Sequence, residues 1–194
     1  MTFSKWKQLC EKYNYIPIIL DEVMWIVSGI SCVGKTFFLE NKKDRLLEIT
    51  NSYHTSFSVR AAYSVFGRDI ANKNFNASDW EHLKNICVHL QLGNDSRMVM
   101  GAPYYTIWER INKLKIQKKV IVLGVPRSEH KVRVKCRDKI KKVGRPLLDD
   151  VQILNLYRKW IDELNEKEIP YLLVEAIGDY EVLEEEEFFR MLND

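Results

Sequence analysis

The segment GISCVGKT, residues 29–36, limits the possible folds of this chain more narrowly than any other part of it. It matches the pattern G-x-x-x-x-G-K-[ST] in full, follows the apolar run 24–27 and precedes a segment of helical character. Glycines in this pattern permit backbone angles closed to most residues, so successive N–H groups can curl around phosphate oxygens. The helix that follows points the positive end of its dipole at the same anion. The sequence therefore predicts a loop that binds the phosphates of a nucleoside triphosphate.

The residues of this loop have expected roles. The side chain of Lys35 should reach the β and γ phosphates, and the hydroxyl of Thr36 should ligate Mg²⁺. The predicted cofactors are therefore ATP and Mg²⁺. The residues expected to contact the nucleotide are Gly29, Ile30, Ser31, Cys32, Val33, Gly34, Lys35, Thr36 and Phe37. The alternative is a glycine-containing turn between a strand and a helix that binds nothing.

Length and composition favour one domain. With 194 residues, 46% of them apolar, the chain can bury a sizeable core but is too short for two ordinary domains and a linker. We expect a single domain over residues 1–194, with residues 1–22 as an N-terminal helix or hairpin extension. The formal net charge of +3 neither demands nor excludes nucleic acid as a partner. Scattered cysteines without metal-ligand spacing, and no apolar run that could span a bilayer, indicate a cytoplasmic protein without a membrane partner.

Apolar runs alternate with helical patterns along the chain. Runs that suit buried parallel strands occur at residues 24–27, 98–100, 120–125 and 171–176, with a weaker candidate at 49–57. Helical patterns occur at residues 36–48, 78–92, 104–114, 149–166 and 180–192. The second of these helices is expected from the capping-box spacing of Ser78 and Glu81 and from Gly93 as its stop. The alternation predicts an α/β fold whose parallel sheet is covered by helices on both faces, with the ligand site where the first core strand ends.

A basic segment follows the strand predicted at residues 120–125. Its cationic residues are Arg127, Lys131, Arg133, Lys135, Arg137, Lys139, Lys141, Lys142 and Arg145. Phosphoryl transfer concentrates negative charge on the γ-phosphate oxygens, and arginines that close over the site neutralise that charge and exclude water. We expect residues 127–148 to form such an arginine-rich lid. The alternatives are a solvated basic helix face and a nucleic-acid-binding patch.

In its layout the chain resembles the P-loop nucleoside and nucleotide kinases, a family that contains thymidylate kinases, deoxynucleoside kinases and their phage relatives. The matching parts are GISCVGKT for the phosphate loop, VIVLGVPRSEHKVRVKCR for the fourth core strand and an R-x-x-x-R lid, and YLLVEA for the fifth strand. The resemblance implies a three-layer P-loop NTPase fold with a five-stranded parallel sheet in the order 2-3-1-4-5. It also implies catalytic roles for Lys35, Arg133 and Arg137, and a nucleotide contact for Arg145.

The same resemblance places the phosphate acceptor between the segments that follow strands two and three, at residues 56–69 and 103–110. Arginine for phosphate and tyrosine for base stacking would fit a nucleotide acceptor there. The resulting candidates for substrate binding are Arg60, Tyr63, Arg68, Tyr104 and Tyr105.

Two acidic positions common in this family are missing. Residues 101–102 are Gly-Ala where an acidic-arginine pair is expected at the end of the third core strand, and VIVLGVP does not end in a Mg²⁺-binding aspartate. A general base or a second protein ligand for Mg²⁺ must then come from elsewhere. The candidates are Asp69, Asp79 and Glu175, and we assign the catalytic role to Asp69.

These features favour an ATP- and Mg²⁺-dependent kinase that transfers the γ-phosphoryl group to a nucleoside or nucleotide. Two alternatives stay open. One is a kinase that phosphorylates a hydroxymethylated base or a terminal hydroxyl in DNA, whose binding to DNA should weaken steeply with salt through counterion release. The other is a regulatory NTPase without an acceptor. Whether the chain forms a homodimer also stays open.

Overall fold

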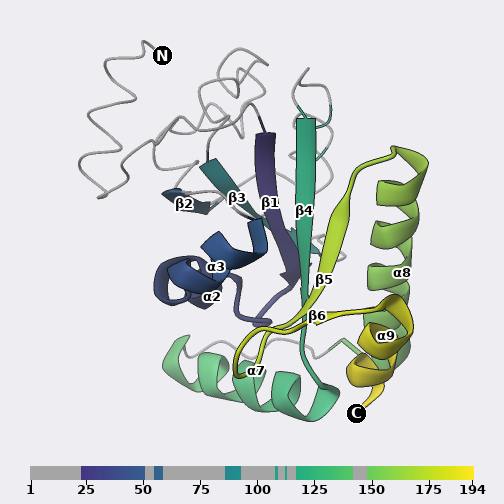
Figure 1. Cartoon of the computed structure of the whole chain (residues 1–194). Coiled ribbons are helices and arrows are strands. Elements are labelled where there is room, and N and C mark those ends of the chain that lie inside the picture. The colour runs from purple at the N-terminus through teal and green to yellow at the C-terminus, as the bar shows by residue number, and fades with distance from the viewer. Residues whose placement is uncertain are drawn as a thin grey trace, which may run out of the picture.

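The computed structural model describes residues 23–50, 55–58, 86–92, 108, 112, 117–141 and 148–194, with the backbone alone at 55–58, 86–89 and 141. The described strands form one six-stranded sheet in the order β2-β3-β1-β4-β5-β6 (Figure 1). They are β1 (Val23–Ile30), β2 (Thr55–Ser58), β3 (Ile86–Leu92), β4 (Gln117–Gly124), β5 (Tyr171–Glu175) and β6 (Val182–Leu183). The pairs among β1 to β5 are parallel, and β6 pairs antiparallel with β5. The sheet thus has one edge strand more than the five that were expected.

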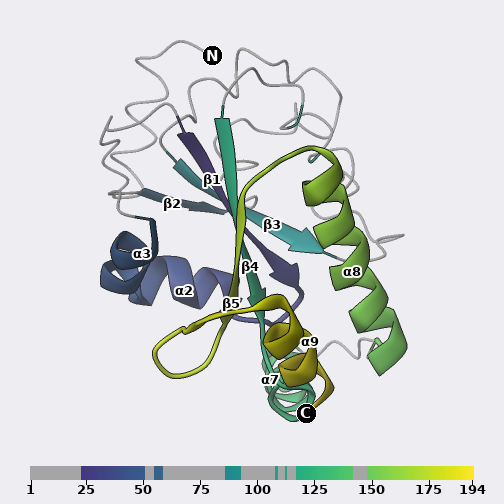
Figure 2. The same ribbon diagram turned by 45° about the vertical axis from the view of Figure 1, so that its right-hand side comes forward.

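Helices cover both faces of this sheet. The described helices are α2 (Lys35–Asn41), α3 (Lys43–Thr50), α7 (Arg127–Lys141), α8 (Asp150–Glu166) and α9 (Glu185–Asn193). Figures 1 and 2 show α2 and α3 on one face and α8 on the other, while α7 crosses beyond the carboxyl ends of β1 and β4. The fold is therefore α/β, as the alternation of apolar and helical segments predicts. None of the described helices combines the length and the apolar character needed to cross a membrane.

The centre of the core is the pair of neighbouring strands β1 and β4. Ile26 of β1 lies in register with Val120 of β4, and both side chains are fully buried. Parallel strands covered on both faces are apolar along their whole length, which makes them recognisable in a sequence. The strands predicted at residues 24–27, 120–125 and 171–176 are confirmed as β1, β4 and β5.

The helix predicted over residues 149–166 is confirmed as α8. Its N-terminus is a capping box, in which the Asp149 carboxylate accepts from the N–H of Gln152 at 2.7 Å and the Gln152 side chain accepts from the N–H of Asp149 at 3.1 Å. One stripe of the helix is buried, formed by Ile153, Tyr157, Trp160, Ile161 and Leu164. This stripe packs α8 onto the sheet.

The helix predicted over residues 78–92 is wrong where it meets the sheet, because residues 86–92 form β3, which pairs with both β1 and β2. The segment ICVHLQL has an apolar residue at every second position, which is the period of a strand. A place beside β1 requires that period and overrides the local capping signal. The strand predicted at residues 98–100 lies outside the described residues, and its expected place beside β1 is occupied by β3.

Three other boundaries differ from the prediction. Residues 36–48 belong to two helices, since the backbone leaves the helical conformation at Lys42 (φ −122°, ψ 42°). Helix α3 continues to Thr50, so β2 begins only at Thr55. The C-terminal helix starts at Glu185 and not at Tyr180, because Tyr180 has a φ of 59° and residues 182–183 form β6.

Candidate functional site: a phosphate loop beside a pocket

The loop between β1 and α2 has the backbone of an anion-binding turn. Within residues 29–34, φ is positive at Gly29 (150°), Cys32 (66°) and Gly34 (110°). Alternation of right- and left-handed backbone angles directs successive N–H groups into one concavity. A Cβ atom at position 29 would lie 2.7 Å from the carbonyl oxygen of Leu123 at the end of β4. Glycine is therefore required there both for its backbone angle and for the close contact between β1 and β4.

Lys35 is buried within this loop, with 4% of its surface exposed. Its ammonium group donates hydrogen bonds to the carbonyl oxygens of Gly29 at 2.7 Å and Ile30 at 2.6 Å. Burial lowers the pKa of Lys35 to about 7, an effect that Cys32 opposes and the charge of Arg137 reinforces. An anion bound in the loop would stabilise the charged form of this ammonium.

Arg137 of α7 contacts the first turn of the loop. Its Nη1 donates to Oγ of Ser31 at 2.8 Å and lies 3.2 Å from Sγ of Cys32. Arg137 and Lys35 together give the loop a cationic surrounding that suits a polyphosphate.

The remaining basic side chains of α7 divide between two faces. Exposed lysines follow one another at every fourth position, namely Lys131, Lys135 and Lys139. They correspond to the solvated basic face considered as an alternative to the lid. Arg127 is also directed away from the loop, because it contacts the Asp150 carboxylate and the Leu148 carbonyl. Within the described part of the basic segment, Arg133 and Arg137 are the arginines that reach the loop.

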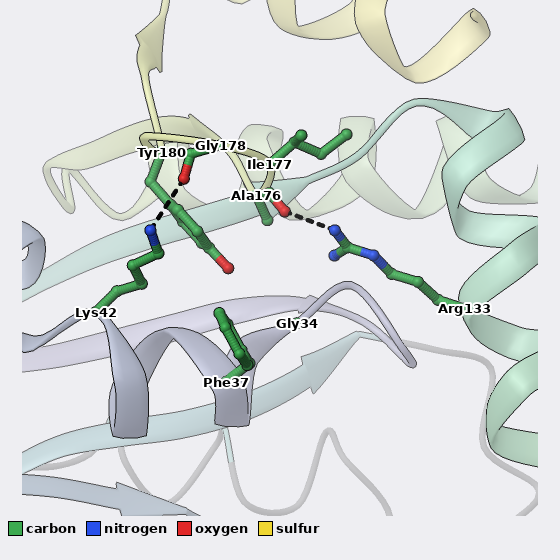
Figure 3. Close-up of a pocket in the computed structure, with 8 residues that line it drawn as sticks. All are labelled: Gly34, Phe37, Lys42, Arg133, Ala176, Ile177, Gly178 and Tyr180. Carbon is green, nitrogen blue, oxygen red and sulfur yellow. Dashed lines mark hydrogen bonds between the residues drawn. The ribbon is translucent and has the colours of Figure 1, made fainter.

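A pocket of about 500 Å³ opens next to the loop (Figure 3). It is lined by Gly34, Phe37, Lys42, Arg133, Ala176, Ile177, Gly178 and Tyr180. Phe37 has 54% of its surface exposed, and Ile177 is also partly exposed. Exposed apolar side chains beside a cationic loop are the surroundings in which a flat, partly apolar ring can bind.

Arg133 joins this pocket to the loop. Its Nη1 donates to the carbonyl oxygen of Val33 at 2.8 Å and its Nη2 to that of Ala176 at 2.9 Å. Its Nε is paired with Oε1 of Glu129 one turn earlier in α7 at 2.6 Å. The planar guanidinium thereby fixes the segment after β5 relative to the phosphate loop.

Tyr180 closes the other side of the pocket. Its ring stacks on Phe38 of α2 with centroids 4.8 Å apart, and its carbonyl oxygen accepts from Arg45 of α3 at 3.2 Å. Lys42, in the break between α2 and α3, donates to the Gly178 carbonyl at 3.2 Å (Figure 3). The pocket wall is thus held by α2, α3 and α7 together.

Sequence reasoning missed Tyr157 of α8 as a support for the loop. Its hydroxyl donates to the carbonyl oxygen of Leu123 at 2.7 Å and accepts from the N–H of Ile30 at 3.4 Å. Burial raises the pKa of this phenol, so it stays protonated. A tyrosine within an otherwise apolar stripe was the available signal, because a buried phenol needs a hydrogen-bond partner.

The structure describes the predicted phosphate loop, but it does not describe the residues predicted to bind the phosphate acceptor. All of residues 29–37 are described, and Thr36 and Phe37 are exposed in the first turn of α2. The predicted base, acceptor residues and third lid arginine lie outside the described residues: Asp69, Arg60, Arg68, Tyr63, Tyr104, Tyr105 and Arg145. So do residues 1–22 and 142–147. Of the predicted lid, residues 127–141 form α7.

The described residues include no group of three or more His, Cys, Asp or Glu side chains placed to hold a metal ion. Thr36 is an exposed residue, and its hydroxyl stays the predicted side-chain ligand for Mg²⁺. Residues 101–102 were expected to follow the third core strand directly. This prediction is wrong, because the strand in that place is β3, which ends at Leu92.

Comparison with known proteins supports the fold alone. No protein-family model matches the sequence, and no curated protein matches it. A solved structure from the PezAT chromosomal toxin–antitoxin system of Streptococcus pneumoniae is similar, with a TM-score of 0.52 and 12% sequence identity over 100% of this chain and 88% of that chain. At 12% identity, this similarity shows a related architecture and says nothing about activity.

Proposed function

We propose that this chain is an ATP- and Mg²⁺-dependent kinase with a P-loop NTPase fold, which transfers the γ-phosphoryl group to a nucleoside or nucleotide. One juxtaposition carries the proposal. A buried lysine in the loop, two arginines of α7 and a pocket of about 500 Å³ meet beyond the carboxyl ends of β1 and β4. That volume suits a nucleoside, and the loop suits the attached phosphates.

The residues of the site would divide the work of phosphoryl transfer. Lys35 would exchange the carbonyl oxygens of Gly29 and Ile30 for the oxygens of the β and γ phosphates. Arg137, already at the first turn of the loop, would stabilise the charge that develops on the transferred group. Mg²⁺, when held by the Thr36 hydroxyl, supplies further neutralisation of the phosphate oxygens. Arg133, Phe37 and the segment after β5 would orient the base.

β3 lies beside β1, so the acidic residue that the family resemblance implies after this strand is to be sought in the sequence that follows Leu92, and not at residues 101–102. β3 ends at Leu92, and the sequence continues with Gly93, Asn94 and Asp95. Asp95 therefore joins Asp69 as a candidate general base for a hydroxyl acceptor. Asp95→Asn and Asp69→Asn separate the two candidates, because loss of the base lowers kcat about 100-fold or more while ATP affinity is retained.

A transfer assay tests the proposal. The protein is mixed with Mg²⁺ and ATP labelled at the γ-phosphate, together with nucleosides, nucleoside monophosphates and DNA carrying modified bases. We expect label on a nucleoside or nucleotide, lost in Lys35→Met and kept in the control Lys43→Met, whose lysine is exposed on α3. Label on DNA alone would favour the polymer alternative. Release of label only as free phosphate, or no effect of Lys35→Met, would rule out the proposed kinase.

A further inference from the structure

His130 lies where α7 meets the phosphate loop and has no role in the proposed phosphoryl transfer. It is buried, with 5% of its surface exposed. Its Nε2 lies 2.8 Å from the carbonyl oxygen of Ser31, a residue 99 positions away, and its Nδ1 lies 3.0 Å from Nη1 of Arg127. Both ring nitrogens are therefore engaged, one toward the loop and one toward the rest of α7.

These two contacts fix the protonation state of the ring. A carbonyl oxygen can only accept, so Nε2 must carry the hydrogen and donate to Ser31. A guanidinium can only donate, so Nδ1 must be unprotonated and accept from Arg127. The neutral ring with hydrogen on Nε2 satisfies both contacts, whereas a protonated ring would set an N–H against the N–H of Arg127.

The charges around the ring favour the same state. Arg127 and Arg133 face it from α7, and Lys35 faces it from α2. Burial lowers the pKa of His130 below its usual 6.5; the hydrogen bond to Ser31 opposes this shift, and the three cations add to it. The nearest acid along the line of contacts is Asp150, which is already paired with Arg127. At neutral pH the ring is therefore uncharged.

The contact with Ser31 determines which way a peptide group of the loop faces. In a trans peptide, the carbonyl oxygen of Ser31 and the N–H of Cys32 point to opposite sides of the chain. His130 holds the carbonyl toward α7, so the N–H of Cys32 is turned away from α7. The positive φ of Cys32 belongs to the same local geometry.

A line of polar contacts continues from His130 to α8. Arg127 is buried and contacts the carboxylate of Asp150, the first residue of α8, and the carbonyl of Leu148 just before it. These contacts connect the orientation of the Ser31 peptide to the N-terminus of α8, which lies on the face of the sheet opposite to α2.

We propose that His130 is a positioning residue of the phosphate loop, which fixes the orientation of the Ser31–Cys32 peptide and is itself oriented by Arg127 and Asp150. The part of this inference that concerns ATP rests on the proposed function. The part that concerns the shape of the loop does not.

Two variants of His130 separate positioning from simple packing. His130→Gln keeps a side-chain amide donor for Ser31, whereas His130→Phe keeps the bulk of the ring and removes both polar contacts. We expect His130→Phe to raise amide hydrogen exchange in residues 30–35 of the nucleotide-free protein about tenfold and to weaken ATP binding about tenfold, the loss of one hydrogen bond to a buried group. His130→Gln should stay within about threefold of the wild type in both measurements.

The pH profile is a further readout. Relative to His130→Gln, the wild type should lose ATP affinity only as the pH falls through the lowered pKa of His130, on the acid side of 6.5, because protonation of the ring opposes the contact with Arg127. Titration of ATP itself is common to both proteins and cancels in the comparison. Equal pH profiles for the wild type and His130→Gln would contradict the proposed role of the neutral ring.

The remaining outcomes are also decisive. If loop exchange is unchanged in His130→Phe, or if His130→Gln behaves like His130→Phe, His130 is a packing residue. If His130→Phe does not fold, Asp150→Asn serves in its place, since the Asp150 side chain is 59% exposed. It should raise loop exchange about threefold, and unchanged exchange would contradict the connection to α8. If the wild type binds no ATP, the proposed kinase fails while the exchange result still decides the role of His130.

Discussion

Arg133 donates a hydrogen bond to the carbonyl oxygen of Val33 at 2.8 Å, across 100 positions of sequence. The same guanidinium holds the carbonyl of Ala176 at 2.9 Å. The phosphate loop and the segment after β5 therefore share one support, although nothing in either segment alone would show it. A ligand that spans the loop and the pocket would contact the groups that Arg133 holds together.

Arg133→Lys should distinguish the two halves of the site. A lysine cannot donate to both carbonyls in the planar arrangement of arginine, so the pocket side loses its support. We expect Arg133→Lys to weaken ATP binding more than tripolyphosphate binding, and Arg137→Lys to weaken both by a similar factor. Calorimetric titration measures each affinity, with Arg190→Lys on the exposed side of α9 as the control. Equal losses for both ligands in Arg133→Lys would contradict a base in the pocket.

Lys35 should make ATP binding depend on pH. In the nucleotide-free protein its pKa is about 7, and bound phosphates would raise that pKa, so binding above pH 7 takes up a proton. Affinity should then fall by up to about tenfold per pH unit above pH 7. Calorimetry in two buffers of different ionisation enthalpy measures the uptake, which Lys35→Met should abolish. An identical heat in both buffers would show that Lys35 does not gain charge.

The same residue should affect stability with a defined sign. The pKa of Lys35 is lower in the folded state than its usual 10.5, so between pH 7 and 10.5 the unfolded chain binds more protons. The contribution of Lys35 to stability therefore rises with pH through this window, and the full cost of the buried charge is present below pH 7. Lys35→Met should raise the Tm of the nucleotide-free protein at pH 6.5, and by less at pH 10. A lower Tm at pH 6.5 would mean that the contacts with Gly29 and Ile30 outweigh that cost.

Two adjacent phenylalanines offer a matched pair. Phe38 is fully buried against Tyr180, so Phe38→Ala should reduce the free energy of unfolding by about 3–5 kcal/mol. Phe37 is largely exposed at the pocket, and Phe37→Ala should change the free energy of unfolding by less than about 0.5 kcal/mol. We nevertheless expect Phe37→Ala to weaken ATP binding several-fold while leaving tripolyphosphate unaffected. Chemical denaturation and calorimetry provide the two measurements, and unchanged ATP binding would place the base elsewhere.

Gly29 and Gly178 test the requirement for glycine in the loop. Both have positive φ, but an added Cβ at Gly29 meets the Leu123 carbonyl at 2.7 Å, whereas at Gly178 no atom lies within 4 Å. Gly178→Ala should therefore cost about 1 kcal/mol for the backbone angle alone. Gly29→Ala should cost at least about 2 kcal/mol more, because β1 and β4 must separate. Similar unfolding free energies for the two variants would mean that the ends of β1 and β4 adjust freely.

The sequence indicates the centre of this fold better than its edges. β1, β4 and β5 are covered by helices, so each is an apolar run that stands out without any partner being known. β3 carries the alternating pattern of a strand, but a capping signal at Ser78 and Glu81 and a stop at Gly93 favour a helix over the same residues. β6 has only two residues, Val182 and Leu183, and its pairing with β5 follows from the turn at Tyr180. Such pairings depend on tertiary context, which local propensity does not contain.

The candidate site shows the same division. The phosphate loop is a local pattern of eight residues, so the curled backbone of the loop could be anticipated, whereas the burial of Lys35 became visible only in the structure. The supports of the loop come from far along the chain, as with Tyr157, which lies 127 positions from Ile30, and His130, which lies 99 positions from Ser31. Spacing within α7 groups its side chains by face, but the packing against the sheet decides which face meets the loop.

The short strand β6 also has a consequence for how molecules of this protein meet one another. An exposed sheet edge offers unpaired N–H and C=O groups to a neighbouring chain and can promote aggregation. Here Leu173 and Val174 of β5 are paired with β6, and a strand of two residues leaves little edge for a second molecule. The turn that makes this hairpin also forms the pocket wall around Gly178 and Tyr180. The pairing of the β5 edge and the shape of the pocket wall therefore depend on the same few residues, so loss of the hairpin would expose the edge of β5 and open the pocket at once.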